Sequence, residues 1–149
     1  MYKLSKKFKF AAAHRLPQLS DNHQCSKIHG HNYSVIVDLY SNKLNDDEFV
    51  IDFGDLKSFQ KYLDKYFDHA IMVYNQDKKM YKILELDKKE NLNIFKVVKL
   101  DFIPTSENLA KHFCNVIKKK YKKKIPGLEL IVVSVEESAN NIASCRLKI

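Results

Sequence analysis

The sequence has few cysteines and no long apolar run, and each absence excludes a class of protein. Its 149 residues contain three cysteines. An odd number without short paired spacings argues against a disulfide framework and favours a reducing, cytoplasmic compartment. The longest apolar run, "LIVVSV" at residues 130–135, is strand-sized, whereas a membrane helix needs about 20 apolar residues. Lys9 interrupts the apolar stretch near the N-terminus, so we expect neither a cleaved signal peptide nor a membrane partner.

Glycine- and serine-rich linkers, internal repeats and low-complexity tracts are also absent. The length matches one domain, and 45% apolar with 30% charged residues is typical of a globular chain. We therefore expect a single domain over residues 1–149 with its own hydrophobic core.

Arginine is scarce, although the net charge of +8 would suit a nucleic-acid-binding protein. Only Arg15 and Arg146 are arginines, and arginine is the preferred residue for bidentate phosphate and base contacts. The densest basic run, "KKKYKKK" at residues 118–124, follows an expected helix, where lysines complement the helix dipole. We therefore expect no nucleic-acid partner.

Apolar spacing predicts strands in the first third of the chain and a helix after it. Residues 3–16 and 31–41 alternate as strands, and the first places Phe8, Phe10, Ala12 and His14 on one face. From Asp52 the spacing becomes helical and continues to about residue 68, so Asp52 or Asp55 is expected to cap a first helix.

The second half predicts a strand pair, a helix and a hairpin. Residues 80–102 suggest two strands around "DKKEN". A helix should follow Pro104, capped by Thr105 or Ser106, and end before Pro126. Strands at 128–137 and 142–149 are joined by the turn sequence "SANN". This order predicts an α+β fold, an antiparallel sheet with two helices on one face.

The stretch "CSKIHGHNY" at residues 25–33 concentrates metal-binding side chains before a strand. Residues i and i+2 of a strand point to the same side, so His29 and His31 can present both imidazoles from one face. If the first strand pairs with this one, His14 supplies a third. Three neutral histidines suit Zn²⁺ and leave one coordination position open, as a catalytic zinc requires.

Cys25 leaves an alternative, because its thiolate could close the site as a fourth ligand. Structural zinc sites favour several thiolates at C-x2-4-C spacing, and a fold of this size needs no zinc staple. The open site is therefore favoured. The closed site would instead suit a basic nucleic-acid-binding domain with a zinc-stapled sheet.

Glu137 is a further candidate, since it falls in phase with the apolar residues 131, 133 and 135 of its strand. A carboxylate at the end of an apolar face needs a donor partner. Glu136, in the opposite phase, is expected to face solvent.

Six segments together resemble the family of 6-pyruvoyl-tetrahydropterin and 6-carboxytetrahydropterin synthases. They occur in family order and cover nearly the whole chain: "FAAAHRL", "CSKIHGHNY", "VIDFGDLK", "FDHAIM", "PTSENLA" and "VSVEESANNI". The resemblance implies the tunnelling fold, in which subunits assemble into a barrel. It also implies a homohexamer with active sites between subunits, leaving strands 3–16 and 142–149 as free edges for pairing between chains.

The resemblance also assigns roles to residues. It implies that His14, His29 and His31 bind zinc, and that Cys25 is the general base with Asp68 and His69 as its relay. Glu137 would hold the pterin ring, whose two N–H donors match a carboxylate. The further substrate contacts are expected from Thr105, Glu107, Arg15 and Lys27.

The implied substrate is 7,8-dihydroneopterin triphosphate, and two products are possible within the family. The three residues between Cys25 and His29 resemble the bacterial 6-carboxy type, which releases acetaldehyde and triphosphate and supplies queuosine synthesis. The alternative is the 6-pyruvoyl product. The chain departs from the family in a longer segment at residues 75–102, which bears on pocket size and subunit packing.

Overall fold

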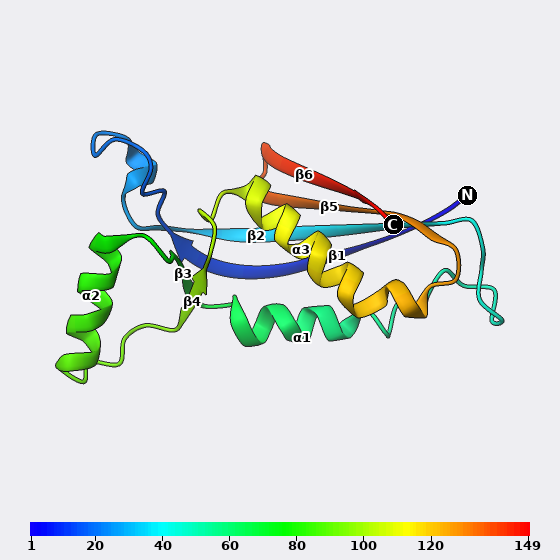
Figure 1. The fold of residues 1–149 in the computed structure, drawn as a ribbon, viewed down its shortest axis with the longest axis horizontal. Coiled ribbons are helices and arrows are strands. Elements are labelled where there is room, and N and C mark those ends of the chain that lie inside the picture. Colours follow the sequence, from blue (N-terminus) through cyan, green and yellow to red (C-terminus); the bar gives the residue numbers. More distant parts are fainter.

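The computed structural model describes all residues, 1–149, as one α+β unit (Figure 1). Its elements, in chain order, are β1 (Tyr2–His14), the short 3-10 helix η1 (Gln24–Ser26), β2 (His29–Ser41), α1 (Lys57–Tyr66), β3 (Ala70–Tyr74), α2 (Lys78–Lys89), β4 (Val97–Leu100), α3 (Ser106–Tyr121), η2 (Lys122–Lys124), β5 (Leu128–Ser138) and β6 (Asn141–Lys148).

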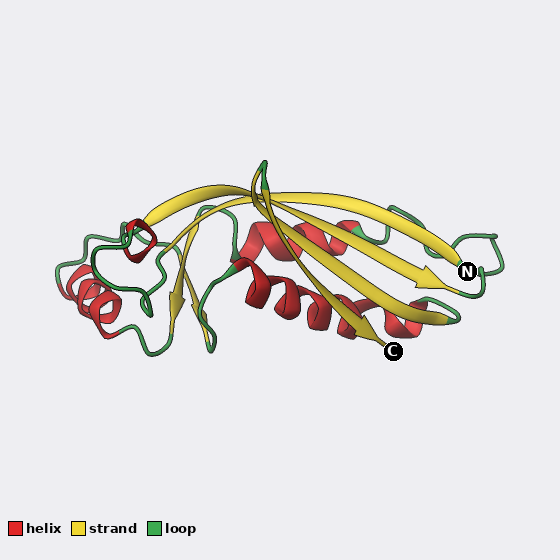
Figure 2. Ribbon diagram, turned by 90° about the horizontal axis from the view of Figure 1, so that it is seen from above, coloured by secondary structure: helices red, strands yellow, loops and turns green.

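The six strands form one sheet in the order β4-β3-β1-β2-β5-β6. Pairs β1–β2, β2–β5 and β5–β6 are antiparallel, whereas β3 runs parallel to both β1 and β4. The sheet is curved, and α1 and α3 cover one of its faces (Figure 2). Helix α2 stands apart, beside β3 and the loop that follows β1 (Figure 1).

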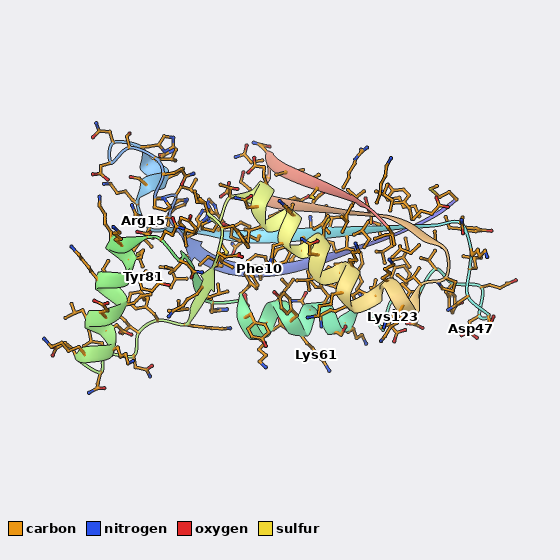
Figure 3. All side chains as sticks on the ribbon, viewed as in Figure 1. Phe10, Arg15, Asp47, Lys61, Tyr81 and Lys123 are labelled. Carbon is orange, nitrogen blue, oxygen red and sulfur yellow. The ribbon has the colours of Figure 1, made fainter.

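The main core fills the space between the sheet and helices α1 and α3. Phe10, which lies between these layers in Figure 3, stacks on Tyr33 with ring centroids 4.8 Å apart and meets Phe67 and Phe113 edge-on. Strands β1, β2 and β5 contribute alternate apolar side chains to this core, because every second side chain of a strand points toward the helices. A smaller core around Met80 attaches α2 to β3.

Several elements agree with the sequence-based expectations. The strands at the start of the chain, the helix after Pro104 and the C-terminal hairpin all lie where they were predicted. The Thr105 hydroxyl caps α3 by accepting a hydrogen bond from the Asn108 backbone N–H at 3.2 Å. Ser138 pairs with Asn141 across the predicted turn.

The predicted strand pair at residues 80–102 is wrong. Most of its first half is helix α2, and only β4 is a strand. The Asp77 carboxylate caps α2 by accepting from the Met80 N–H at 3.2 Å, and Met80 and Leu84, one helical turn apart, face the smaller core. Strand β3, which was not predicted, joins the sheet through parallel pairing.

Two further expectations are corrected. Helix α1 begins at Lys57 with Leu56 as its N-cap residue and no side-chain cap, so neither Asp52 nor Asp55 caps it. Strand β1 is not an edge, because β3 and β2 flank it; the edges of the sheet are β4 and β6. No helix in the chain is both long enough and apolar enough to span a membrane.

Gly127 illustrates how one backbone position constrains the turn into β5. Its φ of +64° lies in the left-handed region, and an added Cβ would collide with the Asn42 side chain. We expect Gly127→Ala to lower the free energy of unfolding by about 1–3 kcal/mol, measured by urea denaturation. Gly30→Ala is the matched control, because its Cβ would meet only the Ala12 carbonyl at 3.5 Å. Equal losses in both variants would contradict this explanation.

Candidate metal centre and substrate pocket

Three histidines converge at one end of the sheet, on the face that the helices cover. His14 is the last residue of β1 and lies directly opposite His29, the first residue of β2. His31 follows two positions later on the same face of β2. The ring centroids are 4.6, 5.2 and 4.8 Å apart for the pairs 14–29, 14–31 and 29–31. The predicted cluster of imidazoles is therefore present.

Backbone carbonyls fix the orientation of two of the rings. His14 Nδ1 lies 2.8 Å from the Pro104 carbonyl, and His29 Nδ1 lies 2.8 Å from the Lys27 carbonyl. Because a carbonyl only accepts hydrogen bonds, both Nδ1 atoms carry the proton and both Nε2 atoms keep a free lone pair. This arrangement is typical of metal-binding histidines, whose second nitrogen is held by an acceptor.

Glu137, near the end of β5, supplies a fourth ligand atom. Its Oε1 lies 3.2 Å from His14 Nε2 and 3.1 Å from His31 Nε2, and one ligand atom from each of the four residues lies within 4.8 Å of every other. The sequence placed Glu137 on the correct face of its strand, but gave no sign that it reaches the histidines. Contact depends on how far β5 extends along β2.

These donors fit a zinc ion. Ligand atoms around tetrahedral zinc lie roughly 3.3–3.5 Å apart, close to the distances between Glu137 and the two histidines. His31 Nε2 is buried and makes no hydrogen bond, although the Glu137 carboxylate lies beside it. The lone pair of His14 Nε2 faces the same carboxylate oxygen at 3.2 Å, and two acceptors this close are unfavourable unless a cation lies between them. Nitrogen and carboxylate oxygen donors both suit zinc.

Burial lowers the pKa of His14 to about 4 and also lowers the pKa of His31. Both imidazoles are therefore neutral near pH 7, as a metal ligand must be. In the unfolded chain a histidine takes up its proton near pH 6.5, whereas folded His14 resists protonation until about pH 4. The unfolded state then binds more protons in this window, so stability falls as pH falls.

We expect the metal-free protein to lose about 2–3 kcal/mol of unfolding free energy between pH 7 and pH 4.5, measured by urea denaturation. His112, whose pKa burial also lowers, contributes with the same sign. Two variants separate the contributions of His14 and His112. His14→Gln should reduce most of the pH dependence of the unfolding free energy, whereas His112→Gln should leave most of it. A stability that is unchanged or higher at the lower pH would contradict this prediction.

Cys25 lies beside the cluster in sequence but is not one of its four members. It is a half-buried free thiol in η1, the short helix of the loop between β1 and β2. Its N–H donates to His23 Nδ1 at 3.1 Å, and its carbonyl accepts from the Leu16 N–H at 2.9 Å. The geometry thus supplies Glu137, rather than the Cys25 thiolate, as a fourth donor near the histidines.

Asp68 and His69 form the pair that the resemblance implies. His69 Nδ1 lies 2.7 Å from Asp68 Oδ2, a contact that neighbouring residues reach here because His69 has a φ of +59°. The Ala11 N–H donates to Asp68 Oδ1 at 2.8 Å, and this bond is the main reason that the pKa of Asp68 lies below its usual value. The His69 ring is largely exposed and borders a pocket that Ala13 also lines.

This pair does not join the metal cluster within one chain. The Ala11 and Ala13 side chains alternate with Ala12 and His14 along β1, so they point away from the helix-covered face, while Ala12 and His31 also border the pocket. Asp68 and His69 are therefore not members of the histidine–Glu137 cluster of their own chain, although His31 borders the same pocket as His69.

A second pocket, of about 380 Å³, adjoins the metal cluster. Glu137 lines it together with Thr105 and Glu107 from the start of α3, so three of the predicted substrate residues share one pocket. Ser106 also lines it, and its hydroxyl oxygen is buried without a hydrogen-bond partner. The sequence gave Ser106 only as an alternative cap; its position beside Thr105 in "PTSEN" was the available signal.

Arg15 and Lys27, the predicted triphosphate contacts, differ in setting. Lys27 is exposed at the end of η1. The Arg15 guanidinium is buried and paired with Asp77 at 2.7 Å, so the structure gives it a partner within the chain. Glu136, expected in solvent, forms an exposed ion pair with Lys7 at 2.7 Å.

Comparison with known sequences identifies the relatives of this chain. The sequence model of the 6-pyruvoyl tetrahydropterin synthase family matches residues 3–148. A 6-carboxy-5,6,7,8-tetrahydropterin synthase of Rickettsia conorii is 32% identical over 118 residues, covering 78% of this chain and 80% of the relative. A protein of the same name from Haemophilus influenzae is 35% identical over 138 residues, covering 87% and 92%.

Solved structures agree on the fold. An uncharacterized protein from Wolinella succinogenes superposes with a TM-score of 0.81 at 20% identity, covering 99% of this chain and 97% of that one. The 6-pyruvoyltetrahydropterin synthase of Plasmodium vivax superposes with a TM-score of 0.73 at 19% identity, covering 99% and 98%.

Proposed function

The chain belongs to the 6-pyruvoyl tetrahydropterin synthase family, and on that premise we propose that it converts 7,8-dihydroneopterin triphosphate to 6-carboxy-5,6,7,8-tetrahydropterin. Acetaldehyde and triphosphate are released. The observation that carries the proposal is the cluster of three histidines and Glu137 beside a pocket lined by Thr105 and Glu107. We propose a cytoplasmic enzyme whose product enters queuosine synthesis.

His14, His29 and His31 would hold the zinc ion. When bound, zinc lowers the pKa of the substrate side-chain hydroxyls and stabilises negative charge that develops on them. The carbonyls of Pro104 and Lys27 keep two of the rings in the tautomer that this requires.

Cys25 is proposed as the general base that takes a proton from the substrate side chain. The thiolate, not the thiol, is the form that can take up a proton. Asp68 orients His69, and the His69 ring relays the proton.

Glu137 is proposed to hold the pterin ring through its amino and ring N–H groups. Its carboxylate borders both the metal cluster and the 380 Å³ pocket, so a pterin bound there would have its side chain next to the metal. Thr105 and Glu107 line the same pocket as further contacts. Lys27 is kept as a proposed triphosphate contact, whereas the Arg15 guanidinium is engaged by Asp77 and Ser26.

We propose that the active site forms between subunits of a homohexamer. Asp68 and His69 are not members of the metal cluster of their own chain, which supports a role at the cluster of a neighbouring chain. The free edges β4 and β6 are available for pairing between chains.

The 6-carboxy product is supported by the names of the curated relatives and by the spacing of Cys25 and His29. The second candidate is the 6-pyruvoyl product, which is favoured by the name of the Plasmodium vivax structure. The same substrate and the same metal site serve both.

Mass spectrometry of the pterin formed from 7,8-dihydroneopterin triphosphate by zinc-loaded protein tests the proposal. A 6-carboxy product with an equal amount of acetaldehyde is expected. A 6-pyruvoyl product would overturn the product assignment but keep the site. No pterin product from fully zinc-loaded protein would overturn the proposed activity.

A further inference from the structure

The loop that carries Cys25 is attached to helix α2 by a buried ion pair. Arg15 directly follows β1, and Asp77 directly precedes α2; in Figure 3 Arg15 lies where this loop meets the helix. Arg15 Nη1 lies 2.7 and 2.8 Å from the two carboxylate oxygens of Asp77. Both residues are buried, with 9% of Arg15 and 4% of Asp77 exposed.

The same guanidinium also holds the backbone next to Cys25. Arg15 Nε donates to the Ser26 carbonyl at 2.8 Å, and Ser26 is itself 2% exposed. Leu16 adds a second hydrogen bond, from its N–H to the Cys25 carbonyl at 2.9 Å. The carbonyls of two successive loop residues are therefore fixed by the two residues that follow β1.

These hydrogen bonds join the backbone around Cys25 to the residues that follow His14. His14, a member of the metal cluster, immediately precedes Arg15. The next two residues, Arg15 and Leu16, donate hydrogen bonds to the Ser26 and Cys25 carbonyls. At the other end of the loop, His29 donates to the Lys27 carbonyl. Relative motion between the thiol and the imidazoles is restricted from both sides.

Asp77 is suited to this task by its second contact. Its Oδ1 accepts from the Met80 N–H, so the carboxylate is anchored to the first turn of α2, and Met80 is buried against β3. A buried ion pair is a poor source of stability by itself, because desolvation offsets most of the attraction. Two nitrogens of the planar guanidinium are nevertheless engaged, Nη1 by both oxygens of Asp77 and Nε by the Ser26 carbonyl, so the orientation of Arg15 is fixed.

We propose that Arg15 and Asp77 are positioning residues that place the Cys25 thiol relative to the metal histidines, and that α2 is the support for this pair. The inference rests on the proposed role of Cys25 as general base. It also gives α2, the helix within the long segment after residue 75, a role in supporting the active site. Near an attacking group, a displacement of about 1 Å costs on the order of 100-fold in rate.

Asp77→Asn is the main test, because asparagine still caps a helix but no longer carries the charge that orients Arg15. We expect kcat to fall by about 10- to 100-fold while KM changes by less than about three-fold. The d–d absorption spectrum of the cobalt-substituted protein should stay unchanged, since the three histidines are intact. Asp21→Asn is the matched control: Asp21 joins the same loop to α2 through Lys79 at 3.0 Å, but both side chains are exposed. This control should keep the wild-type kcat.

A double variant keeps the test decisive if Asp77→Asn folds poorly. Arg15→Met with Asp77→Ser removes both charges. The serine hydroxyl can still cap α2, and the methionine replaces the buried guanidinium with an apolar side chain. We expect this protein to fold and bind zinc but to show the same loss in kcat. A wild-type kcat in either folded variant would overturn the proposal.

Alkylation of Cys25 separates this proposal from the proposed activity. The rate at which iodoacetamide modifies Cys25 in zinc-loaded protein, followed by peptide mass spectrometry, needs no substrate. We expect a change of at least about three-fold in Asp77→Asn and none in Asp21→Asn. If wild-type protein makes no pterin product but this difference is found, the activity is wrong and the positioning holds; equal rates in all three proteins overturn the positioning.

Discussion

His29→Ala is expected to remove zinc binding and turnover together while leaving the fold intact. The variant leaves two imidazoles, and two neutral nitrogens bind zinc far more weakly than three. Loss of an outer partner of a metal ligand already costs about 10- to 100-fold in affinity, so loss of the ligand itself should cost at least about 100-fold. We expect less than a tenth of the wild-type zinc after dialysis against a competing chelator, and kcat/KM reduced in proportion.

His29 is a better choice than His14 for this test because its side chain is only half-buried, whereas His14 is 1% exposed. The main core lies between the sheet and helices α1 and α3 and does not include His29. The far-ultraviolet circular dichroism spectrum should therefore match that of the zinc-stripped wild type. His112→Gln is the control, since His112 contacts Tyr62 rather than the cluster. Full zinc occupancy in His29→Ala would refute the assigned ligand set.

The metal site could be predicted from the sequence because it depends on local rules. Side chains two apart on a strand share a face, which fixes His29 and His31, and antiparallel pairing of the first two strands brings His14 opposite them. The contact of Glu137 with the histidines could not be predicted by these local rules alone. Its phase along β5 follows from the sequence, but its contact with the histidines depends on the register between β5 and β2, which no local pattern encodes.

The errors arose where distant parts of the chain decide the structure. Helix α2 has helical spacing at Met80 and Leu84, but Ile83 and Leu86 are exposed, so the apolar pattern is blurred. Strand β3 is a short apolar run whose parallel partners lie more than fifty residues before it and more than twenty after it. For the same reason, the internal place of β1 in the sheet could not be read from the sequence.

The Asp68–His69 contact was implied by the resemblance, but the local sequence pattern did not predict it. The resemblance paired these two residues, whereas side chains of sequence neighbours rarely meet. The positive φ of His69 is what turns the two side chains toward one another. A non-glycine residue in this region is unusual and costs free energy, and such positions cluster at functional sites.

Cys25→Ala is expected to lower kcat strongly while zinc and fold are retained. General-base catalysis contributes about 10²- to 10⁴-fold, so we expect kcat to fall within that range with zinc stoichiometry unchanged. The backbone of residue 25 makes its hydrogen bonds to His23 and Leu16 through main-chain atoms, which alanine keeps. The loop should therefore hold its shape, and the thermal midpoint should change by no more than about 2 °C.

Cys145→Ala provides the matched control, because Cys145 is also a half-buried free thiol and lies on β6, outside the metal cluster. Activity, zinc content and the cobalt spectrum together decide between the possible roles of Cys25. Loss of activity with zinc retained identifies the base. Loss of zinc would instead identify Cys25 as the fourth ligand of a closed structural site. That result would favour the alternative of a nucleic-acid-binding domain. Full activity with zinc retained would move the base to another residue, and His69, with its imidazole held by Asp68, would be the group to replace next.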